Sequence, residues 1–267
     1  MLTLPPDILS APTDIPAAEL LEDAFLPADA VPTSVNGYLV NLGDRLALID
    51  TGAAGGMGEG LGRLSANLAA AGVDPADVDD VLMTHLHPDH ANGLLTVDGQ
   101  AAFPNATLHV AKAEAGFWRD DGMMSRAPAE ARPFFVAARD AIAPYDRAGR
   151  LNILAGPGQV LPGVDAIAAP GHTPGHTLFM LSSGSDQLLV WGDIVHIAAI
   201  QFPRPDSTVA FDTDQARAAQ SRVKVMDQVA ADRTLVAGMH LGFPGIGHVA
   251  QASEGYAFVP VMWMPDL

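Results

Sequence analysis

Residues 84–90 read T-H-L-H-P-D-H, and this stretch carries the strongest signal for fold and chemistry in the chain. Its four ligand-type side chains fall within six positions: His85, His87, Asp89 and His90. Neutral imidazole nitrogens and carboxylate oxygens are usual ligands of zinc and related divalent metals. Because an apolar run at residues 81–83 precedes the motif, we expect a strand to deliver these side chains to the edge of a sheet. His85 and His87 can then converge on one ion, while Asp89 and His90 turn towards a second.

Three later segments also end an apolar run in a ligand-type side chain. His172 follows residues 164–169, Asp193 follows residues 188–191, and His240 follows residues 235–238. Since each run is typical of a strand, all three side chains could project from the same edge of a layered sheet.

The whole set, in its order along the chain, resembles the signature of the metallo-β-lactamase superfamily. That signature is H-x-H-x-D-H followed by a histidine, a bridging aspartate and a last histidine, and it is matched by His85, His87, Asp89, His90, His172, Asp193 and His240. Other stretches, among them T-S-V-N-G-Y-L-V-N-L-G, L-I-D-T-G-A-A-G and F-P-G-I-G-H, are similar to the methyl parathion hydrolase branch. The resemblance spans residues 33–261 and implies an α/β fold, the αβ/βα sandwich, with two central mixed β-sheets flanked by helices.

The resemblance also implies a centre of two divalent metal ions, zinc first, with manganese, cobalt or iron as alternatives. One ion would take His85, His87 and His172, the other would take Asp89, His90 and His240, and Asp193 would bridge them. Two close cations lower the pKa of a shared water, so a bridging hydroxide would attack a phosphorus or carbonyl carbon. Asp193 and Asp89 are therefore predicted to be catalytic as well as metal-binding.

We predict from this a metal-dependent hydrolase of organophosphate triesters, similar to methyl parathion hydrolase, with side activity on aryl esters and lactones. One alternative is a lactonase whose native substrates are acyl-homoserine or other lactones. A second alternative is a non-catalytic metal-binding protein. Structural zinc sites are usually closed shells of four ligands, so seven ligands and no cysteine favour an open hydrolytic site for a small ester, phosphotriester or lactone.

Two further histidines lie next to ligand positions in the sequence. His196 comes three residues after Asp193, where lactonase relatives often carry a tyrosine. We predict that it lines the substrate pocket and acts as a catalytic proton donor when charged; a solvent-facing loop histidine is the alternative. His176 repeats the P-G-H-T context of His172 and is predicted to orient the ligands from behind.

The substrate pocket of such an enzyme should be apolar and aromatic. Only 6% of the residues are aromatic, so their placement matters. By resemblance, Trp118, Phe134 and Phe135 would lie at the pocket mouth, and Met57 would replace an aromatic residue there. Core packing is the alternative for Phe134 and Phe135.

Length and composition set the domain organisation. A chain of 267 residues that is 49% apolar can form one substantial domain. We assign residues 1–30 to a proline-rich, irregular N-terminal arm and residues 31–267 to a single hydrolase domain. The resemblance suggests a homodimer, with which an apolar arm is compatible.

The net charge and the N-terminal sequence bear on which partners and which compartment we expect. With 14 basic and 31 acidic residues the formal charge is −17, which argues against nucleic acid because like charges repel. No apolar run reaches the ~18 residues of a membrane helix, so no membrane partner is expected. The first residues lack the features of an export signal. We therefore expect a cytoplasmic protein as written, or a periplasmic or secreted one if the chain is a trimmed mature form.

Periodicity and turn residues predict the main elements. We expect a hairpin of residues 35–42 and 45–50, strands at 77–83, 178–181, 188–191 and 235–237, and helices at 61–71, 130–142 and 214–229.

Overall fold

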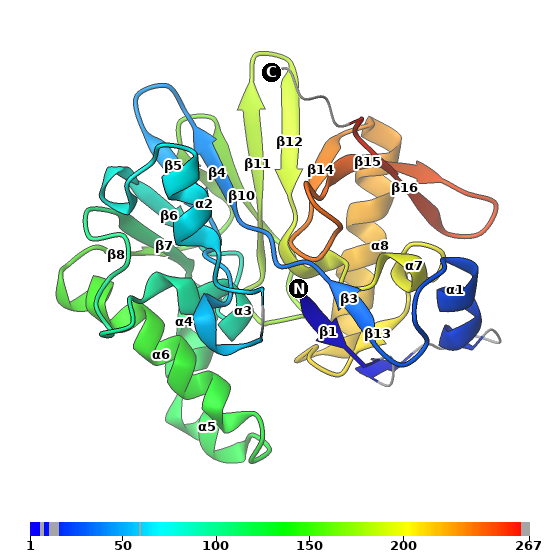
Figure 1. The fold of residues 1–267 in the computed structure, drawn as a ribbon, viewed down its shortest axis with the longest axis horizontal. Coiled ribbons are helices and arrows are strands. Elements are labelled where there is room, and N and C mark those ends of the chain that lie inside the picture. Colours follow the sequence, from blue (N-terminus) through cyan, green and yellow to red (C-terminus); the bar gives the residue numbers. More distant parts are fainter. Residues whose placement is uncertain (6–7, 11–15, 59, 263–267) are drawn as a thin grey trace.

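The computed structural model describes residues 1–5, 8–10, 16–58 and 60–262, and two β-sheets form its centre (Figure 1). The first sheet has the order β4-β5-β6-β7-β8. Its strands are β4 (Tyr38–Asn41), β5 (Leu46–Ile49), β6 (Asp80–Leu82), β7 (Thr107–Ala111) and β8 (Leu151–Leu154). β4 and β5 are antiparallel and the other neighbours are parallel, so the sheet is mixed.

The second sheet has the order β16-β15-β14-β12-β11-β10-β9. Its strands are β9 (Gly158–Leu161), β10 (Val164–Ala168), β11 (Thr177–Ser183), β12 (Asp186–Val190), β14 (Leu235–Ala237), β15 (Ile246–Gln251) and β16 (Tyr256–Pro260). β12 and β14 are parallel, while the other pairs are antiparallel, so this sheet is mixed too.

Helices cover the outer faces of both sheets (Figure 1). The helices beside the first sheet are α2 (Leu64–Ala70), α3 (Pro88–Ala91), α4 (Lys112–Arg119), α5 (Asp121–Arg126) and α6 (Arg132–Arg147). Those on the side of the second sheet are α1 (Ala17–Asp23), α7 (Ala198–Gln201) and α8 (Gln215–Asp232). Short 3₁₀ turns are η2 (Ala54–Gly56), η3 (Pro75–Asp77), η4 (Asn92–Leu94) and η5 (Gly192–Ile194).

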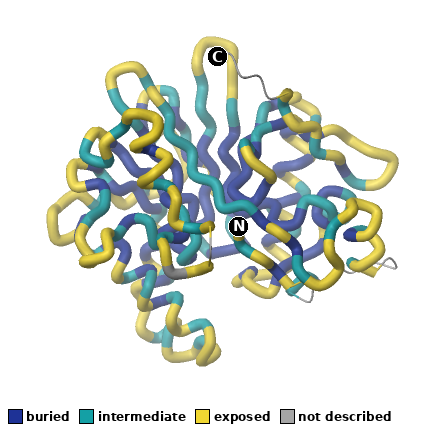
Figure 2. Tube along the Cα trace, in the orientation of Figure 1, coloured by how far each residue is buried: buried dark blue, intermediate teal, exposed yellow. Residues whose placement is uncertain are grey.

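The alternation of side chains along the strands explains the layers. In β5, Ala47 and Ile49 belong to the core between the sheets, while Leu48 belongs to the core under the helices. Successive side chains of a strand point to opposite faces, so an apolar strand such as β5 needs cover on both. The buried strands lie in the middle of the molecule and the exposed turns at its rim (Figure 2). The predicted αβ/βα sandwich of two mixed sheets and outer helices is confirmed.

The N-terminal residues are more ordered than the sequence predicts. β1 (Leu2–Leu4) pairs with β3 (Val31–Thr33), and β2 (Leu9–Ser10) pairs with β13 (Thr208–Val209). Between β2 and β3 in the chain, α1 buries Leu21 against Ile197 and Ile200. The expectation of an irregular segment is wrong for residues 17–23, because this apolar contact with α7 stabilises a helix that its short sequence pattern does not reveal.

The other predicted elements are found with shifted ends. The hairpin of β4 and β5 forms as expected, and Leu42 N–H donates to the Arg45 carbonyl across its turn. Helix α6 continues through Pro144 to Arg147, beyond its predicted end. Helix α8 begins after Asp214, whose side chain accepts the Arg217 N–H.

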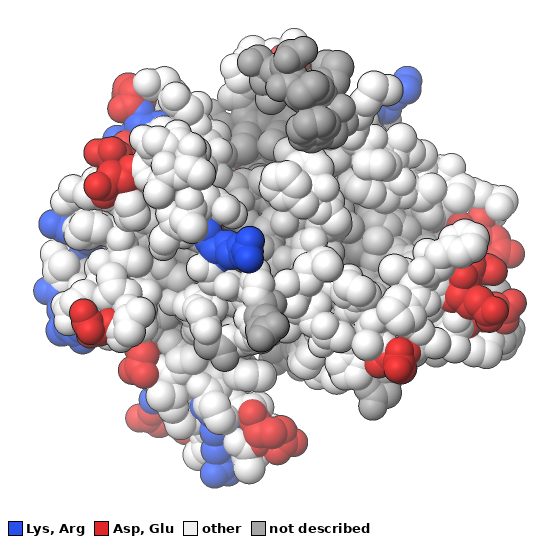
Figure 3. All heavy atoms as spheres, in the orientation of Figure 1, with Lys and Arg blue, Asp and Glu red and all other residues white. Residues whose placement is uncertain are grey.

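Charged side chains are unevenly distributed over the surface. On the face drawn in Figure 3, acidic side chains lie mainly towards the rim, and the middle of the face is uncharged apart from a basic group near its centre. Within the described residues, no helix is long and apolar enough to cross a membrane.

Candidate metal centre

The ligand-type residues lie in loops that directly follow strands. His85 and His87 come after β6, and His90 lies in α3, whose first turn begins with Pro88. His172 lies beyond the end of β10, and His240 beyond the end of β14. The strand-end arrangement expected from the sequence is what brings loops of both sheets to one place.

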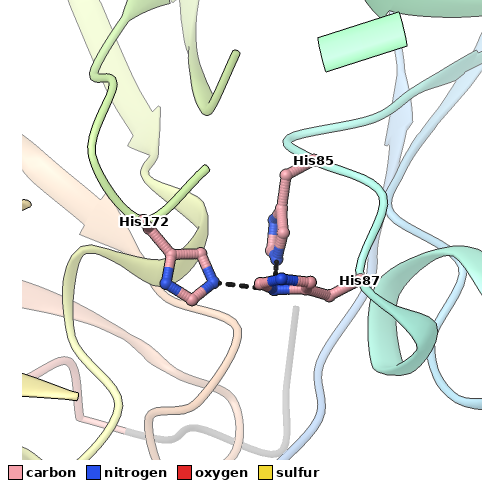
Figure 4. Close-up of side chains that lie close together, drawn as sticks. All are labelled: His85, His87 and His172. Carbon is pink, nitrogen blue, oxygen red and sulfur yellow. Dashed lines mark hydrogen bonds between the residues drawn. The ribbon is translucent and has the colours of Figure 1, made fainter. Parts of the chain in front are cut away.

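Three imidazoles from the two sheets form the first cluster. His85 Nε2 lies 3.0 Å from His87 Nδ1, and His87 Nδ1 lies 2.9 Å from His172 Nε2. Figure 4 shows the three rings pointing at one another from two separate loops. These are the three side chains that the family resemblance assigns to one ion.

A second cluster lies beside the first. The Asp89 carboxylate is 3.5 Å from His90 Nε2 and 3.6 Å from His240 Nε2. Asp193 lies between the clusters: its Oδ2 is 3.2 Å from His172 Nε2 and 3.1 Å from His240 Nε2, and its Oδ1 is 3.2 Å from His90 Nε2. A carboxylate that reaches both clusters is placed as a bridging ligand would be.

The far nitrogens of four rings are held by other groups. His85 Nδ1 lies 3.0 Å from the Thr84 hydroxyl, His90 Nδ1 2.7 Å from Asp50, His172 Nδ1 2.9 Å from Asp212, and His240 Nδ1 2.8 Å from the Ser34 carbonyl. When the Nδ1–H of a ring donates to such a group, its Nε2 lone pair faces the centre of the cluster. Metal-binding histidines are usually oriented by a hydrogen bond of this kind.

The donor set fits two divalent cations. Among the described residues, His90 Nε2 and Asp193 Oδ1 are buried 3.2 Å apart, but neither makes a hydrogen bond of good geometry to the other or to any other group. Leaving such an atom unpaired costs about 1–3 kcal/mol, and a cation would satisfy both. A zinc–nitrogen bond is about 2.0–2.1 Å, so two ligands of one ion lie within about 4 Å of each other. The distances above meet that condition.

Opposite charges within the cluster offset the effect of burial on the pKa values of its side chains. Burial alone would raise the pKa of Asp193, but His240, His90 and His85 hold that pKa well below its usual range. Burial likewise opposes charge on His172, yet Asp193 and Asp212 raise its pKa to about 9. A cation that binds there must displace protons from such rings.

A cavity of about 140 Å³ adjoins the clusters. Its polar lining residues are His87, Asp89, His172, Asp193, His196 and His240. Its other lining residues are Leu2, Leu4, Met57, Pro88, Phe134 and Phe211, all of which are apolar. A wider hollow along α8 is lined by none of the ligand-type residues.

The predicted pocket residues divide into two groups. Met57 and Phe134 line the cavity. Trp118 and Phe135, expected at the mouth, instead lie in the core, where each is 3% exposed. Their rings pack together with centroids 4.8 Å apart, because the apolar faces of α4 and α6 meet there.

The two additional histidines are both buried at the site. His196 is 3% exposed and its Nε2 lies 3.0 Å from Asp193 Oδ2, so it does not face solvent. Burial lowers the pKa of His196 to about 4. His176 Nε2 accepts the Asp193 N–H at 3.0 Å while its Nδ1–H donates to the Ala169 carbonyl. Gly192 permits this approach, since a Cβ there would lie 2.5 Å from His176 Nε2.

Several residues at the site were not singled out from the sequence. Asp50 lies in the L-I-D-T-G stretch and could have been suspected from it. Asp212 and the Ser34 carbonyl carry no motif and are recognised only once the chain is folded. Leu2, Leu4 and Phe211 were missed because the pairing of β1 with β3 and of β2 with β13 brings distant segments to the cavity.

The family model described as "Metallo-beta-lactamase superfamily" matches residues 30–240. The chain belongs to this superfamily. Its structure superposes with a TM-score of 0.90 on a hydrolase of the beta lactamase superfamily called AbOPH, at 36% identity over 98% of this chain and 92% of that one.

Two other relatives carry more specific names. AidC, a dizinc quorum-quenching lactonase solved with the product N-hexnoyl-L-homoserine, gives a TM-score of 0.86 at 28% identity, over 92% of this chain and 86% of that one. An N-acyl homoserine lactonase of Bacillus thuringiensis is 28% identical over 162 residues, which are 59% of this chain and 54% of that protein. The chain thus matches about half the length of this curated relative.

Proposed function

We propose that this member of the metallo-β-lactamase superfamily is a metal-dependent lactonase that opens N-acyl homoserine lactones or similar neutral lactones. The observation that carries the proposal is the mixed lining of the cavity. Ligand-type residues and apolar residues line the same cavity, and such lactones have a polar ester ring on an apolar chain. The lactonase names of two relatives support the proposal.

The ligand-type residues would hold the metals in the way the geometry suggests. His85, His87 and His172 would bind one cation, Asp89, His90 and His240 the other, and Asp193 both. When bound, two divalent cations, for which zinc is the first candidate, supply an ionised water and polarise a carbonyl oxygen. The protein's part is to fix their positions through Asp50, Asp212 and the other groups behind the rings.

His196 is the residue best placed to meet the substrate itself. It lines the cavity next to Asp193. Ring opening of a lactone releases an alkoxide, which needs a proton, and a side chain at the cavity wall can supply or relay one. The lowered pKa of His196 favours the neutral ring, so an N–H hydrogen bond to the leaving oxygen fits it better than transfer from a cation.

Hydrolysis of aryl phosphotriesters, the function predicted first from the sequence, is the second candidate. Phe134 and Phe211 in the cavity lining would also suit an aryl group. The two candidates differ in their leaving group, because a phenolate departs without a proton and an alkoxide does not. The homodimer and the cellular compartment stay predictions.

The experiment is a comparison of kcat/KM on one zinc-loaded sample with three substrates: an acyl-homoserine lactone, an aryl ester and an aryl phosphotriester. We expect the lactone to exceed the phosphotriester at least about tenfold, which is about 1.4 kcal/mol of transition-state stabilisation. Asp193→Ala serves as the blank for adventitious hydrolysis. A phosphotriester value above the lactone value would overturn the proposal and favour the second candidate.

A further inference from the structure

Glu114 is a buried carboxylate that contacts the metal loops of both sheets. It lies in the first turn of α4 and is 1% exposed. Its Oε1 accepts the Leu86 N–H at 2.9 Å and the Trp118 indole N–H at 2.6 Å. Its Oε2 accepts the Thr173 hydroxyl at 2.6 Å and the Gly175 N–H at 3.1 Å. All four neighbours donate, so they suit an ionised carboxylate that accepts at both oxygens.

The donors sit directly beside the three-histidine cluster. Leu86 lies between His85 and His87, and Thr173 follows His172. The loop that follows β6 in the first sheet and the loop that follows β10 in the second are thereby tied to the same carboxylate. A buried carboxylate is tolerated only where it is fully hydrogen-bonded, so losing its acceptors should loosen both loops.

The packing around Gly175 points to the same connection independently of the hydrogen bonds. A Cβ at Gly175 would lie 2.1 Å from Glu114 N and 2.5 Å from Glu114 Cβ. Any larger residue would push the loop away from α4. The loop that carries His172 is therefore packed directly on the helix turn that carries Glu114.

Trp118 extends the contact to a ligand ring. Its indole N–H is fixed by Glu114, and its ring lies edge-on to His87 with centroids 5.5 Å apart at 70°. His87 presents Nδ1 to the other two rings, so the orientation of its ring decides whether the cluster closes. This explains why Trp118 lies under the site and not at its mouth.

We propose that Glu114 is a positioning residue for the three-histidine half of the metal centre. It joins the two metal loops and so sets the separations among His85, His87 and His172. The other half is supported by different groups, since Asp50 holds His90 and the Ser34 carbonyl holds His240. The proposal goes beyond the proposed function and concerns metal binding alone, whatever the substrate is.

The test is a zinc titration of metal-free protein against a chromophoric chelator, for wild type and for Glu114→Gln. The amide keeps the shape of the side chain but replaces one acceptor oxygen with a donor, so two of the four hydrogen bonds are lost. We expect one of two zinc ions to bind about 10–100-fold more weakly, and the other to change by less than about threefold.

Glu130→Gln is the matched control, because Glu130 is exposed and the change removes the same charge. Its zinc titration should match the wild type. Far-UV circular dichroism and the melting temperature report on folding. In a folded Glu114→Gln protein, an equal weakening of both zinc ions, or of neither, would overturn the proposal.

Thr173→Val keeps the test decisive if Glu114→Gln does not fold. Valine matches threonine in shape and removes a single donor to Glu114. A selective weakening of one zinc ion would support the proposal. Unchanged binding, or equal weakening of both ions, would refute it.

Discussion

For single residues, the geometry of the site depends on the groups that hydrogen-bond the far nitrogen of each imidazole. The sequence predicts the ligand set because the ligand residues occupy one short motif and three strand ends. Among the supporting residues it offers His176 but not Asp212, because Asp212 lies 40 positions from His172 and meets it only through the tertiary fold. His196 shows the same limit: its position near Asp193 follows from the spacing, but its burial does not.

His196→Ala tests the role of that ring. If His196 assists the leaving oxygen, the variant should lose about 10²-fold more kcat/KM on a lactone than on an activated aryl phosphotriester. The reason is that the phenolate leaves without a proton. Parallel assays on both substrates measure the difference. Equal losses on the two would assign His196 to binding or packing.

The His172–Asp212 pair predicts a pH dependence of metal binding. Burial alone would lower the pKa of His172, but Asp193 and Asp212 raise it from its usual 6.5 to about 9, so a proton competes with zinc for this ring at neutral pH. The apparent zinc affinity should therefore rise with pH up to about 9. In Asp212→Asn the raised pKa should fall, and the rise should move to lower pH. A pH-independent affinity in both proteins would contradict this reading.

At the level of elements, helices α8 and α7 hold the loop that contains η5 and His196. Arg222 of α8 is 1% exposed, and its guanidinium donates to the carbonyls of Ile194, Pro205 and Ser207. Gln201 accepts the His196 N–H. These hydrogen bonds hold the loop that follows Asp193 and the segment that leads to Asp212. The 3.6-residue period predicts α8, but an arginine on its inner face could not be distinguished from an exposed one.

Arg222→Leu should destabilise the protein by about 2–4 kcal/mol, because buried carbonyls that lose their donor cost about 1–3 kcal/mol each. Denaturant unfolding measures the change. Arg217→Leu, an exposed position on the same helix, is the control and should stay within about 0.5 kcal/mol of wild type. Similar stabilities for the two variants would show that the buried hydrogen bonds contribute little.

At the scale of the whole molecule, the metal centre lies where the two sheets meet. One ligand group comes from residues 84–90 and the other from residues 172–240, so the site exists only when both halves are packed together. Apolar runs predict individual strands, and the resemblance of the ordered signature to the metallo-β-lactamase superfamily implies the sandwich. The N-terminal wall of the cavity was not predictable, because Leu2 and Leu4 reach it through pairing with β3, and short strands carry little sequence pattern.

We propose that this site holds two metal ions through seven ligands, of which Asp193 alone is shared, and elemental analysis of the purified, active protein measures the number of ions. We predict two divalent ions per chain in the wild type. Asp193→Ala should lose metal together with at least about 10²-fold of activity, since it removes the group that reaches both clusters. One ion or none per chain in fully active protein would contradict the account.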